Sequence, residues 1–443
     1  MGNCLSDWIA NRHINKLKMC GTSLNKVAVA VCLFIGTTLI IVSEIFELKP
    51  LHKIKDWNIQ TELAKLNLAE LSTMKVLKER RQHLEKMCAL HPEISKQKTP
   101  GGSVMVGKKF PFVYCNIPKV GSSTFKRILY GLETNISNPY KMKAIKVHPD
   151  GAVRTYIVNQ DDIDAKMLNK IENYTKVVIV RDPINRLISA YWDKMYSINP
   201  SFWCRRNIAG MIFNLYRRGK VSTDDTSTVN SFNESGDTST NTDTSVPNCI
   251  CDISFKEFIG YIIQQDNKHI NLDKHWRPLY KHCNPCKDMK YDVIAHLETF
   301  NEDTNFFLKK ISGTNQQHDE HDSDVITREV DILLRGYSMP QTKSMCGYSM
   351  QDLIVRAFQG LVARGYISQG AMLPALNPDP KFYTRKRLYA LFLKLYQTSN
   401  GYRISKAELR RNMLKQLPSG MIEKIYDIYR YDFELFGYGY KTH

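Results

Sequence analysis

The chain has 443 residues, enough for two or three domains or for one large domain with appendages. Its hydrophobic content of 43% and charged content of 24% are typical of a globular protein rather than a disordered one. The formal net charge of +18 favours an anionic partner such as a nucleic acid, a membrane or an acidic glycan, although solubility alone is a simpler explanation. Because no zinc-finger spacing or RNA-type aromatic motif occurs, we expect no nucleic-acid partner.

The N-terminal region contains one strongly hydrophobic run, residues 27–42, which residues 43–46 can extend to the length of a membrane span. Lysines and an arginine precede it, and no small-residue cleavage site follows, so we expect a signal-anchor rather than a removable signal peptide. This predicts a cytosolic tail (1–26), a transmembrane segment (27–46) and a luminal remainder. Gly2 also matches a myristoylation pattern, which is open to coincidence.

Two further features agree with a luminal location. Asn135, Asn173 and Asn233 each begin an N-glycosylation sequon. Eight of the eleven cysteines follow the hydrophobic run, and in an oxidising compartment an even set indicates disulfides of undetermined pairing. The alternative is a zinc site formed by the pairs 249/251 and 283/286, but the spacing is unusual for zinc, and we expect no metal.

The luminal part divides by composition. Residues 47–104 are charged, contain leucines and predict a helical stem, through which a homodimer is possible. The compact domain is expected over 105–443, with a Ser/Thr/Asp/Asn-rich stretch at 221–247 forming a disordered insertion. Elsewhere short apolar strands alternate with helical periodicity, which predicts an α/β fold with a central parallel sheet.

One strand-turn-helix pattern is the most informative. Residues 112–117 form a nearly continuous apolar run, as in a strand that is covered on both faces. Pro118 ends the strand and Gly121 permits a tight turn. Ser122 or Ser123 is a suitable cap for the helix that follows.

The turn has the features of an anion site. The first amides of a helix have no internal partner and bind anions with help from the helix dipole. Lys119 adds a positive charge, and Ser122, Ser123 and Thr124 add hydroxyl donors. The lysine precedes the glycine, so the nucleotide-hydrolase P-loop pattern is absent, and an ordinary polar turn is the alternative.

A second strand-helix junction repeats the arrangement. The β-branched strand 176–180 ends at Arg181, at the strand end where α/β proteins place ligands. Asp182 is a good helix cap and Pro183 a good first helical residue. Arg181 can place two donors on a phosphate, and Ser189 lies about two helical turns along.

Four stretches together resemble the Golgi carbohydrate sulfotransferases, in the branch of the chondroitin/dermatan and N-acetylgalactosamine 4-O-sulfotransferases and the glucuronyl 3-O-sulfotransferase. The resemblance covers roughly residues 105–310 and 420–440, and departs from the family at 221–247 and 312–420. The four stretches are Ile117-Pro-Lys-Val-Gly-Ser-Ser-Thr-Phe-Lys-Arg127, Val180-Arg-Asp-Pro-Ile-Asn-Arg-Leu-Ile-Ser-Ala-Tyr-Trp-Asp-Lys194, Asp273-Lys-His-Trp-Arg-Pro278 with Cys283-Asn-Pro-Cys286, and Tyr431-Asp-Phe-Glu-Leu-Phe-Gly-Tyr438.

The resemblance implies a P-loop-like three-layer sandwich and the donor 3'-phosphoadenosine 5'-phosphosulfate. Arg181 and Ser189 would hold the 3'-phosphate. Family members often carry Asn and Trp near positions 124 and 125, where this chain has Thr and Phe, so a side-chain contact there is in doubt. The 5'-phosphosulfate would be held by Lys119, Val120, Gly121, Ser122, Ser123 and Thr124.

Sulfate transfer also needs a base and an acceptor site. The resemblance places a catalytic histidine between the two anion motifs, which favours His148, with His275 as the alternative. Lys119 is the candidate for stabilising the leaving group. Acceptor binding is expected from Lys274, His275, Trp276 and Arg277 through charge and stacking.

The resulting hypothesis is a single-pass type II Golgi membrane enzyme that moves sulfate onto an acidic glycan or proteoglycan. A chondroitin/dermatan-type N-acetylgalactosamine 4-O position is favoured, with a glucuronyl 3-O-sulfotransferase acting on glycoprotein glycans as the alternative. A nucleotide-dependent phosphotransferase and a catalytically inactive glycan-binding protein are the rivals.

Overall fold

The computed structural model describes residues 55–97, 102–142, 147, 151–159, 162–197, 202, 208–217, 250, 252–287, 289–314, 322–334 and 347–439. The predicted tail, membrane span and 221–247 insertion, together with His148 and Asn233, lie outside these ranges. In the described part, none of the helices combines the length and apolar character that crossing a bilayer requires. The chain divides into two units, Met1–Met74 and Lys75–His443, and the second contains the elements discussed below.

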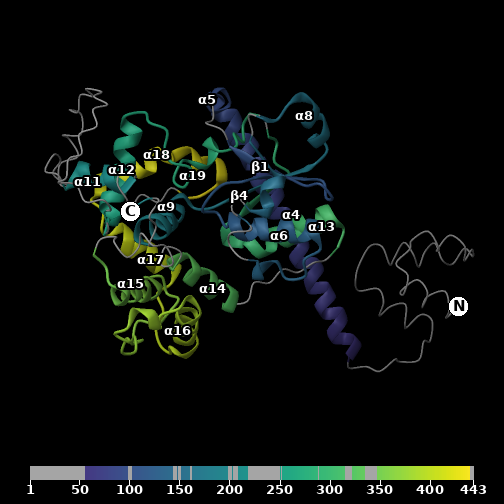
Figure 1. The fold of residues 1–443 in the computed structure, drawn as a ribbon. Helices are drawn as coiled ribbons and strands as arrows, with labels where there is room; N and C mark the ends of the chain where they lie inside the picture. Colours follow the sequence, from purple (N-terminus) through teal and green to yellow (C-terminus); the bar gives the residue numbers. More distant parts are fainter. Residues whose placement is uncertain are drawn as a thin grey trace, which may run out of the picture. The chain divides into compact units, whose positions relative to one another are not determined.

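A five-stranded sheet forms the centre of the second unit (Figure 1), in the order β3-β1-β2-β4-β5. Strands β2, β4 and β5 are parallel, whereas β1 runs antiparallel to both β2 and β3. The strands are β1 (Ser103–Val106), β2 (Phe112–Cys115), β3 (Ile157–Asn159), β4 (Thr175–Val180) and β5 (Val293–His296).

The α/β prediction is therefore confirmed, but the prediction of a wholly parallel sheet is wrong. The connection from β1 to β2, residues 107–111, contains no helix. Such a short connection suffices for an antiparallel return, whereas a parallel pair needs a crossover of a dozen or more residues. The parallel strands β2, β4 and β5 are the ones whose carboxyl ends meet at one edge.

The two faces of β2 have different partners, because successive side chains point to opposite faces. Tyr114 meets Phe125 of helix α6 at 4.7 Å between ring centroids, and Phe112 meets Phe307 of α13 at 6.4 Å. On the other face, Cys115 forms a disulfide. Helices α6 (Ser122–Thr134) and α13 (Phe300–Ser312) thus cover one face and pack on the strand that leads to the first anion motif.

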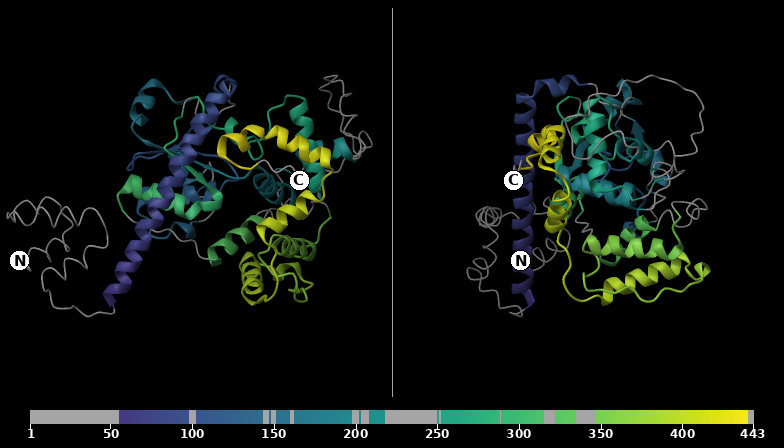
Figure 2. Two further views of the ribbon diagram at one scale, coloured as in Figure 1. Left: turned by 180° about the vertical axis from the view of Figure 1, so that it is seen from behind. Right: turned by 90° about the vertical axis from the view of Figure 1, so that its left-hand side faces the viewer.

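The compact unit begins at Lys75, earlier than the boundary after residue 104 that the sequence predicts. Helix α4 (Lys55–Leu90) is confirmed as helical, but in its second half Leu77 and Leu84 are buried in the same core as the strands. Arg80 donates hydrogen bonds to the carbonyl of Ile294 (3.2 Å) and to Asp303 Oδ2 (2.6 Å). Figure 2 shows this part of α4 crossing the strands.

Two disulfides join segments that are distant in sequence. Cys88 of α4 pairs with Cys286, and Cys115 of β2 pairs with Cys283. Disulfide-bonded sulfurs are not thiolate ligands, so the zinc alternative that uses Cys283 and Cys286 is wrong. The bridges instead agree with the expected oxidising compartment.

Helices make up the rest of the unit. One apolar cluster gathers α9, α11, α12, α17, α18 and α19, and another gathers α14, α15 and α16 (Figure 1). Their bounds, with those of α5 and α8, are α5 (Pro92–Lys96), α8 (Ala165–Ile171), α9 (Pro183–Tyr191), α11 (Ile208–Tyr216), α12 (Phe255–Asn267), α14 (Asp322–Leu333), α15 (Met350–Ala363), α16 (Arg385–Thr398), α17 (Lys406–Leu414), α18 (Ser419–Ile428) and α19 (Arg430–Phe436).

Candidate active site

The two predicted anion motifs meet at one edge of the sheet. Strands β2 and β4 are neighbours and parallel, with Cys115 opposite Val178, so their carboxyl ends lie side by side. The Arg181 guanidinium donates a hydrogen bond from Nη1 to the carbonyl of Lys119 at 3.2 Å. The second motif therefore touches the first directly.

The first motif is a tight loop that leads into α6. Lys119 and Gly121 have φ values of 71° and 82°, which is costly for a lysine and ordinary for a glycine. A Cβ atom on Gly121 would lie 2.8 Å from Leu297 Cδ1, so the close approach also requires glycine. The loop holds its strained residue because the surrounding strand and helix fix both ends.

The cap of α6 differs from the prediction. Gly121, rather than Ser122 or Ser123, is the N-cap residue, and no side chain accepts a hydrogen bond from the first turn. The first amides of α6 therefore keep their donors free of a capping side chain, as an anion site requires.

The loop residues differ in which hydrogen-bond donors a ligand can reach. Val120 is fully buried, so only its backbone can contact a ligand. Ser122 and Thr124 are mostly buried, with 9% and 8% of their surface exposed, whereas Ser123 is exposed. We infer that backbone amides and the Ser123 hydroxyl are the accessible donors of the turn.

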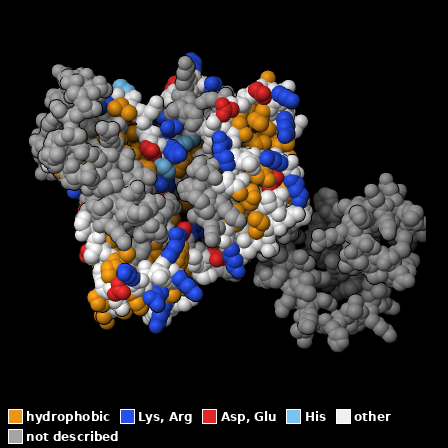
Figure 3. Space-filling view, viewed as in Figure 1, with side chains coloured by type: hydrophobic (Ala, Val, Ile, Leu, Met, Phe, Trp, Pro, Cys, Tyr) orange, Lys and Arg blue, Asp and Glu red, His pale blue; other side chains and the backbone are white. Residues whose placement is uncertain are grey.

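Lys119 lies in a cluster of buried charges. Its Nζ is 3.0 Å from Asp193 Oδ2, and Nζ of Lys194 is 3.2 Å from the same oxygen. Burial lowers the pKa of Lys119, against the attraction of Asp193. Asp193 and Lys194 belong to η5 (Trp192–Tyr196), a π-helical turn that continues α9. Figure 3 shows Lys, Arg and His side chains gathered near the centre of this face.

The second motif is built as predicted. Asp182 caps α9 by accepting a hydrogen bond from the Asn185 amide at 2.8 Å, and Pro183 is the first helical residue. Asp182 is also paired with Arg410 of α17. Burial lowers the pKa of Arg181, and the charge of Glu298 opposes this. Ser189 lies on α9, partly exposed.

Arg186 holds the loops together and does not face a ligand. It is 1% exposed, and its guanidinium donates to the carbonyls of Pro118 (3.0 Å) and Arg277 (2.5 Å). Burial lowers its pKa to about 10. It therefore ties the residue before the anion loop to the 273–278 segment.

His275 is positioned as a base would be. Its Nδ1 lies 2.6 Å from Asp273 Oδ1, so the neutral ring donates there and leaves Nε2 as the acceptor. Burial lowers the pKa of His275, and repulsion by Lys194 and Lys119 adds to this, against the opposing contact with Asp273. The ring thus belongs to the same electrostatic cluster as Lys119.

The other predicted acceptor residues have different surroundings. Lys274 is exposed, and Arg277 is partly exposed and donates from Nε to the Leu272 carbonyl at 3.1 Å. Trp276 is fully buried and meets Phe258 at 5.2 Å between ring centroids. Because the ring is enclosed by protein, the predicted stacking of Trp276 on an acceptor is wrong.

Two of the three predicted glycosylation residues can be placed. Asn135 follows α6 in a left-handed conformation, and Asn173 precedes β4. Both are exposed, as an attached glycan requires.

Sequence reasoning missed three partners. Asp193 and Asp273 hold Lys119 and His275, and both lie inside recognised motifs, where an acid near a cation was the available signal. Arg328 of α14 donates from Nη1 to Thr124 Oγ1 at 3.3 Å. None of the four recognised motifs includes Arg328.

Several known proteins are similar in sequence to this chain. Human carbohydrate sulfotransferase 9 is 28% identical over 262 residues, covering 57% of this chain and 52% of that protein. Carbohydrate sulfotransferase 11 of Danio rerio is 27% identical over 263 residues, covering 57% and 67%. Human carbohydrate sulfotransferase 10 is 29% identical over 219 residues, covering 47% and 52%.

The chain thus spans about half of the length of these two human relatives. No solved structure matches it. The sequence model of the sulfotransferase family matches residues 103–343 and 384–439, which include both candidate anion motifs and confirm the resemblance. The expected departure from the family over 312–420 is therefore wrong except at 344–383. The chain therefore belongs to the sulfotransferase family.

Proposed function

We propose that the protein transfers sulfate from 3'-phosphoadenosine 5'-phosphosulfate to a hydroxyl group of a glycan, on a P-loop-like three-layer α/β domain. One observation carries the proposal: Arg181 at the end of β4 donates to the Lys119 carbonyl in the loop after β2. Two anion-binding junctions in direct contact suit a single donor that has phosphate groups at both ends. Family membership supports the same reaction class.

The donor fits the residues present. The uncapped first turn of α6 and the Ser123 hydroxyl would hold the 5'-phosphosulfate, and Arg181 with Ser189 would hold the 3'-phosphate. The Lys119 ammonium has three donors, so it can keep its contact with Asp193 and still donate to the donor's bridging oxygen. It would stabilise the charge that develops on the leaving phosphate.

We propose His275 as the general base. In the reaction the acceptor hydroxyl gives its proton to Nε2, its oxygen bonds to sulfur, and the bond from sulfur to the phosphate oxygen breaks. Asp273 at 2.6 Å holds the ring in the required tautomer. His148, favoured by the resemblance, remains a prediction outside the described residues.

The acceptor proposed is an acidic glycan or proteoglycan, at an N-acetylgalactosamine 4-O position as in chondroitin or dermatan. The net charge of +18 supports a polyanionic acceptor by steering it to the enzyme. Lys274 and Arg277, on the segment that carries His275, would contact its acidic groups. A glucuronyl 3-O position is the alternative.

The proposed location is the Golgi membrane, with a type II topology and a luminal catalytic domain. The disulfides Cys88–Cys286 and Cys115–Cys283 support an oxidising lumen, and exposure of Asn135 and Asn173 is compatible with glycosylation there. The hydrophobic run 27–46 is the proposed anchor, and the stem is a proposed dimer contact.

The test is a transfer assay with radiolabelled phosphosulfate donor and a panel of desulfated glycans, followed by disaccharide analysis of the labelled product. Sulfate incorporation at one sugar position is the expected result. Transfer of phosphate from ATP with no sulfate transfer would instead indicate a phosphotransferase. Glycan binding by folded protein without any transfer would indicate an inactive binding protein.

A further inference from the structure

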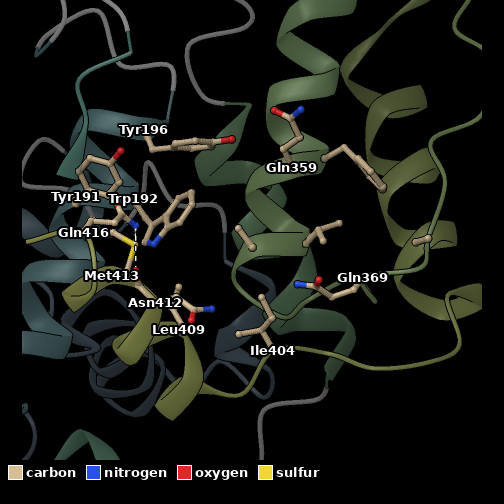
Figure 4. A pocket seen from close by; sticks show the side chains of 14 residues that line it. Tyr191, Trp192, Tyr196, Gln359, Gln369, Ile404, Leu409, Asn412, Met413 and Gln416 are labelled. Carbon is tan, nitrogen blue, oxygen red and sulfur yellow. Dashed lines mark hydrogen bonds between the residues drawn. The ribbon is translucent and has the colours of Figure 1, made fainter. Parts of the chain in front are cut away.

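A pocket of about 400 Å³ lies beside the proposed donor site, between η5, α15 and α17. This volume is within the range of small-molecule sites. Figure 4 shows its walls: aromatic rings of Tyr191, Trp192 and Tyr196 on one side, and Gln359 and Gln369 on the other.

The pocket contains no charged side chain among its lining residues. Its polar groups include the side-chain amides of Gln359, Gln369, Asn412 and Gln416, whereas the hydroxyl groups of its two tyrosines donate to backbone carbonyls. Within the described part of the chain, the amides of Gln359, Gln369 and Asn412 make no hydrogen bond to protein, and all three residues are exposed. Gln369 and Asn412 project into the space between the walls (Figure 4).

This lining predicts the chemistry of the occupant. Aromatic rings offer flat apolar surfaces, and amides both donate and accept hydrogen bonds. A sugar ring with a 2-acetamido group presents the complementary features: an apolar face of C–H groups, hydroxyl groups and one amide. A carboxylate or sulfate would lose hydration here without meeting a cation among the lining residues.

The pocket and the proposed active site share the π-helical turn η5. Trp192 lines the pocket, and its neighbour Asp193 binds the Lys119 ammonium at 3.0 Å. Arg364 provides a second link, because it lies 5.7 Å from the centroid of the Trp192 ring and pairs with Glu329 at 2.7 Å. Because the charge of Glu329 also acts on Lys119, the pocket wall and the proposed donor site are connected through this pair as well as through η5.

The family match runs through only part of this pocket. Tyr191, Trp192 and Asn412 fall in matched segments, whereas Gln359 and Gln369 fall in residues 344–383, between the two matched segments. One wall thus comes from elements shared with the family and the other from a segment outside the match. Such a combination can alter acceptor choice without disturbing donor binding.

We propose that this pocket is an acceptor subsite that binds an uncharged 2-acetamido sugar of the glycan chain other than the sugar that receives sulfate, an inference that rests on the proposed glycan sulfotransfer. Gln369 and Asn412 would hydrogen-bond the acetamido group, and the apolar side chains of the lining would contact the sugar face. The subsite gives specificity for the repeating unit of the glycan, while the cations near Lys119 serve the donor.

The test uses the full-length protein and two unsulfated hexasaccharides, one with N-acetylgalactosamine units throughout and one in which galactose replaces every N-acetylgalactosamine except the sugar that receives sulfate. Binding is measured by titration calorimetry and turnover by labelled sulfate transfer. The double variant Gln369→Ala/Asn412→Ala is compared with Asn267→Ala, which removes an exposed amide at the end of α12.

We expect the double variant to raise both the Kd and the KM of the acetamido acceptor about tenfold, as the loss of two hydrogen bonds does. The value of kcat and the affinity for the donor by-product should remain unchanged, and the preference for the acetamido acceptor over the galactose acceptor should disappear. Asn267→Ala should behave as the unmodified protein.

The inference is overturned if the double variant binds both hexasaccharides as the unmodified protein does, or still prefers the acetamido form. These outcomes are separable from failure of the proposed function. If the unmodified protein binds the acetamido acceptor through Gln369 and Asn412 but transfers no sulfate to any glycan, the subsite stands and the proposed activity does not.

Discussion

The proposed donor edge, where the ends of β2 and β4 meet, and the pocket that contains Gln369 and Asn412 share the turn η5 but differ in how they are built. At the donor edge, Lys119 and Asp193 are mostly buried, each with 14% of its side chain exposed, and are held at 3.0 Å. In the pocket, Gln369 and Asn412 are exposed and uncharged. Buried charges fixed by partners are already in place to stabilise a transition state, whereas exposed amides add only modest binding.

The comparison therefore predicts that substitutions at the proposed donor edge cause large losses of activity, whereas substitutions at the pocket cause small losses of binding. Lys119→Ala tests the first half most directly. It should lower kcat/KM for sulfate transfer about 10³-fold, or about 4 kcal/mol, because it removes charge stabilisation and leaves Asp193 with one cation fewer. Labelled sulfate transfer measures the effect.

The matched control for that change is Lys424→Ala, on α18, where the lysine is exposed. It should retain full activity. Transfer rates within threefold of the unmodified enzyme for Lys119→Ala would remove Lys119 from the donor site and with it the proposed contrast.

Removing a disulfide tests how much the covalent links of the compact unit contribute to its stability. Replacing Cys88 and Cys286 with serine should reduce the free energy of unfolding by about 2–4 kcal/mol, because their 198-residue separation closes a long loop. Chemical denaturation followed by intrinsic fluorescence measures the loss. An unchanged denaturation midpoint, or free thiols at both positions in the unmodified protein, would contradict this prediction.

The proposed base gives a pH prediction. Burial lowers the pKa of His275, so its neutral, proton-accepting form persists to a lower pH than that of a free histidine. The acidic limb of kcat should therefore lie below pH 6.5, the ordinary pKa of histidine, and activity should fall only as pH drops through the lowered pKa. His275→Gln should reduce kcat about 10²-fold, or about 2.7 kcal/mol, and abolish that limb.

The control for this experiment is His269→Gln, at an exposed position after α12. Full activity of His275→Gln with an unaltered pH profile would exclude His275 and direct attention to His148.

Local features of the site could be predicted from sequence, because their causes lie within a few residues. The Asp182 cap, the Pro183 start of α9 and the strand before Arg181 follow from neighbouring residue types, and the structure contains all three. The meeting of the two anion motifs followed from the rule that parallel strand ends share one edge.

What could not be predicted depends on contacts between distant segments. The Lys119–Asp193 pair joins residues 74 positions apart, and the Arg328–Thr124 contact joins residues 204 apart. The antiparallel β1, the disulfide pairing and the burial of Trp276 have the same origin. No local pattern encodes which segment packs against which, so these features required the structure.

Substitution of Arg328 has the smallest predicted effect, and it tests whether α14 contributes to donor binding. The arginine comes from α14, which shares an apolar cluster with α15, yet it donates to Thr124 in the loop after β2 at 3.3 Å. Arg328→Ala should weaken binding of 3',5'-diphosphoadenosine about tenfold, or about 1.4 kcal/mol, since a charged hydrogen-bond donor beside the anion is lost.

Arg328→Lys should restore part of that affinity, because it keeps the charge but not the planar donor geometry. Arg411→Ala, which removes an exposed arginine from α17, is the matched control and should bind as the unmodified protein does. Calorimetric titration distinguishes two outcomes. A weakened donor affinity assigns α14 to the proposed donor site, whereas unchanged donor binding confines that site to the two strand ends.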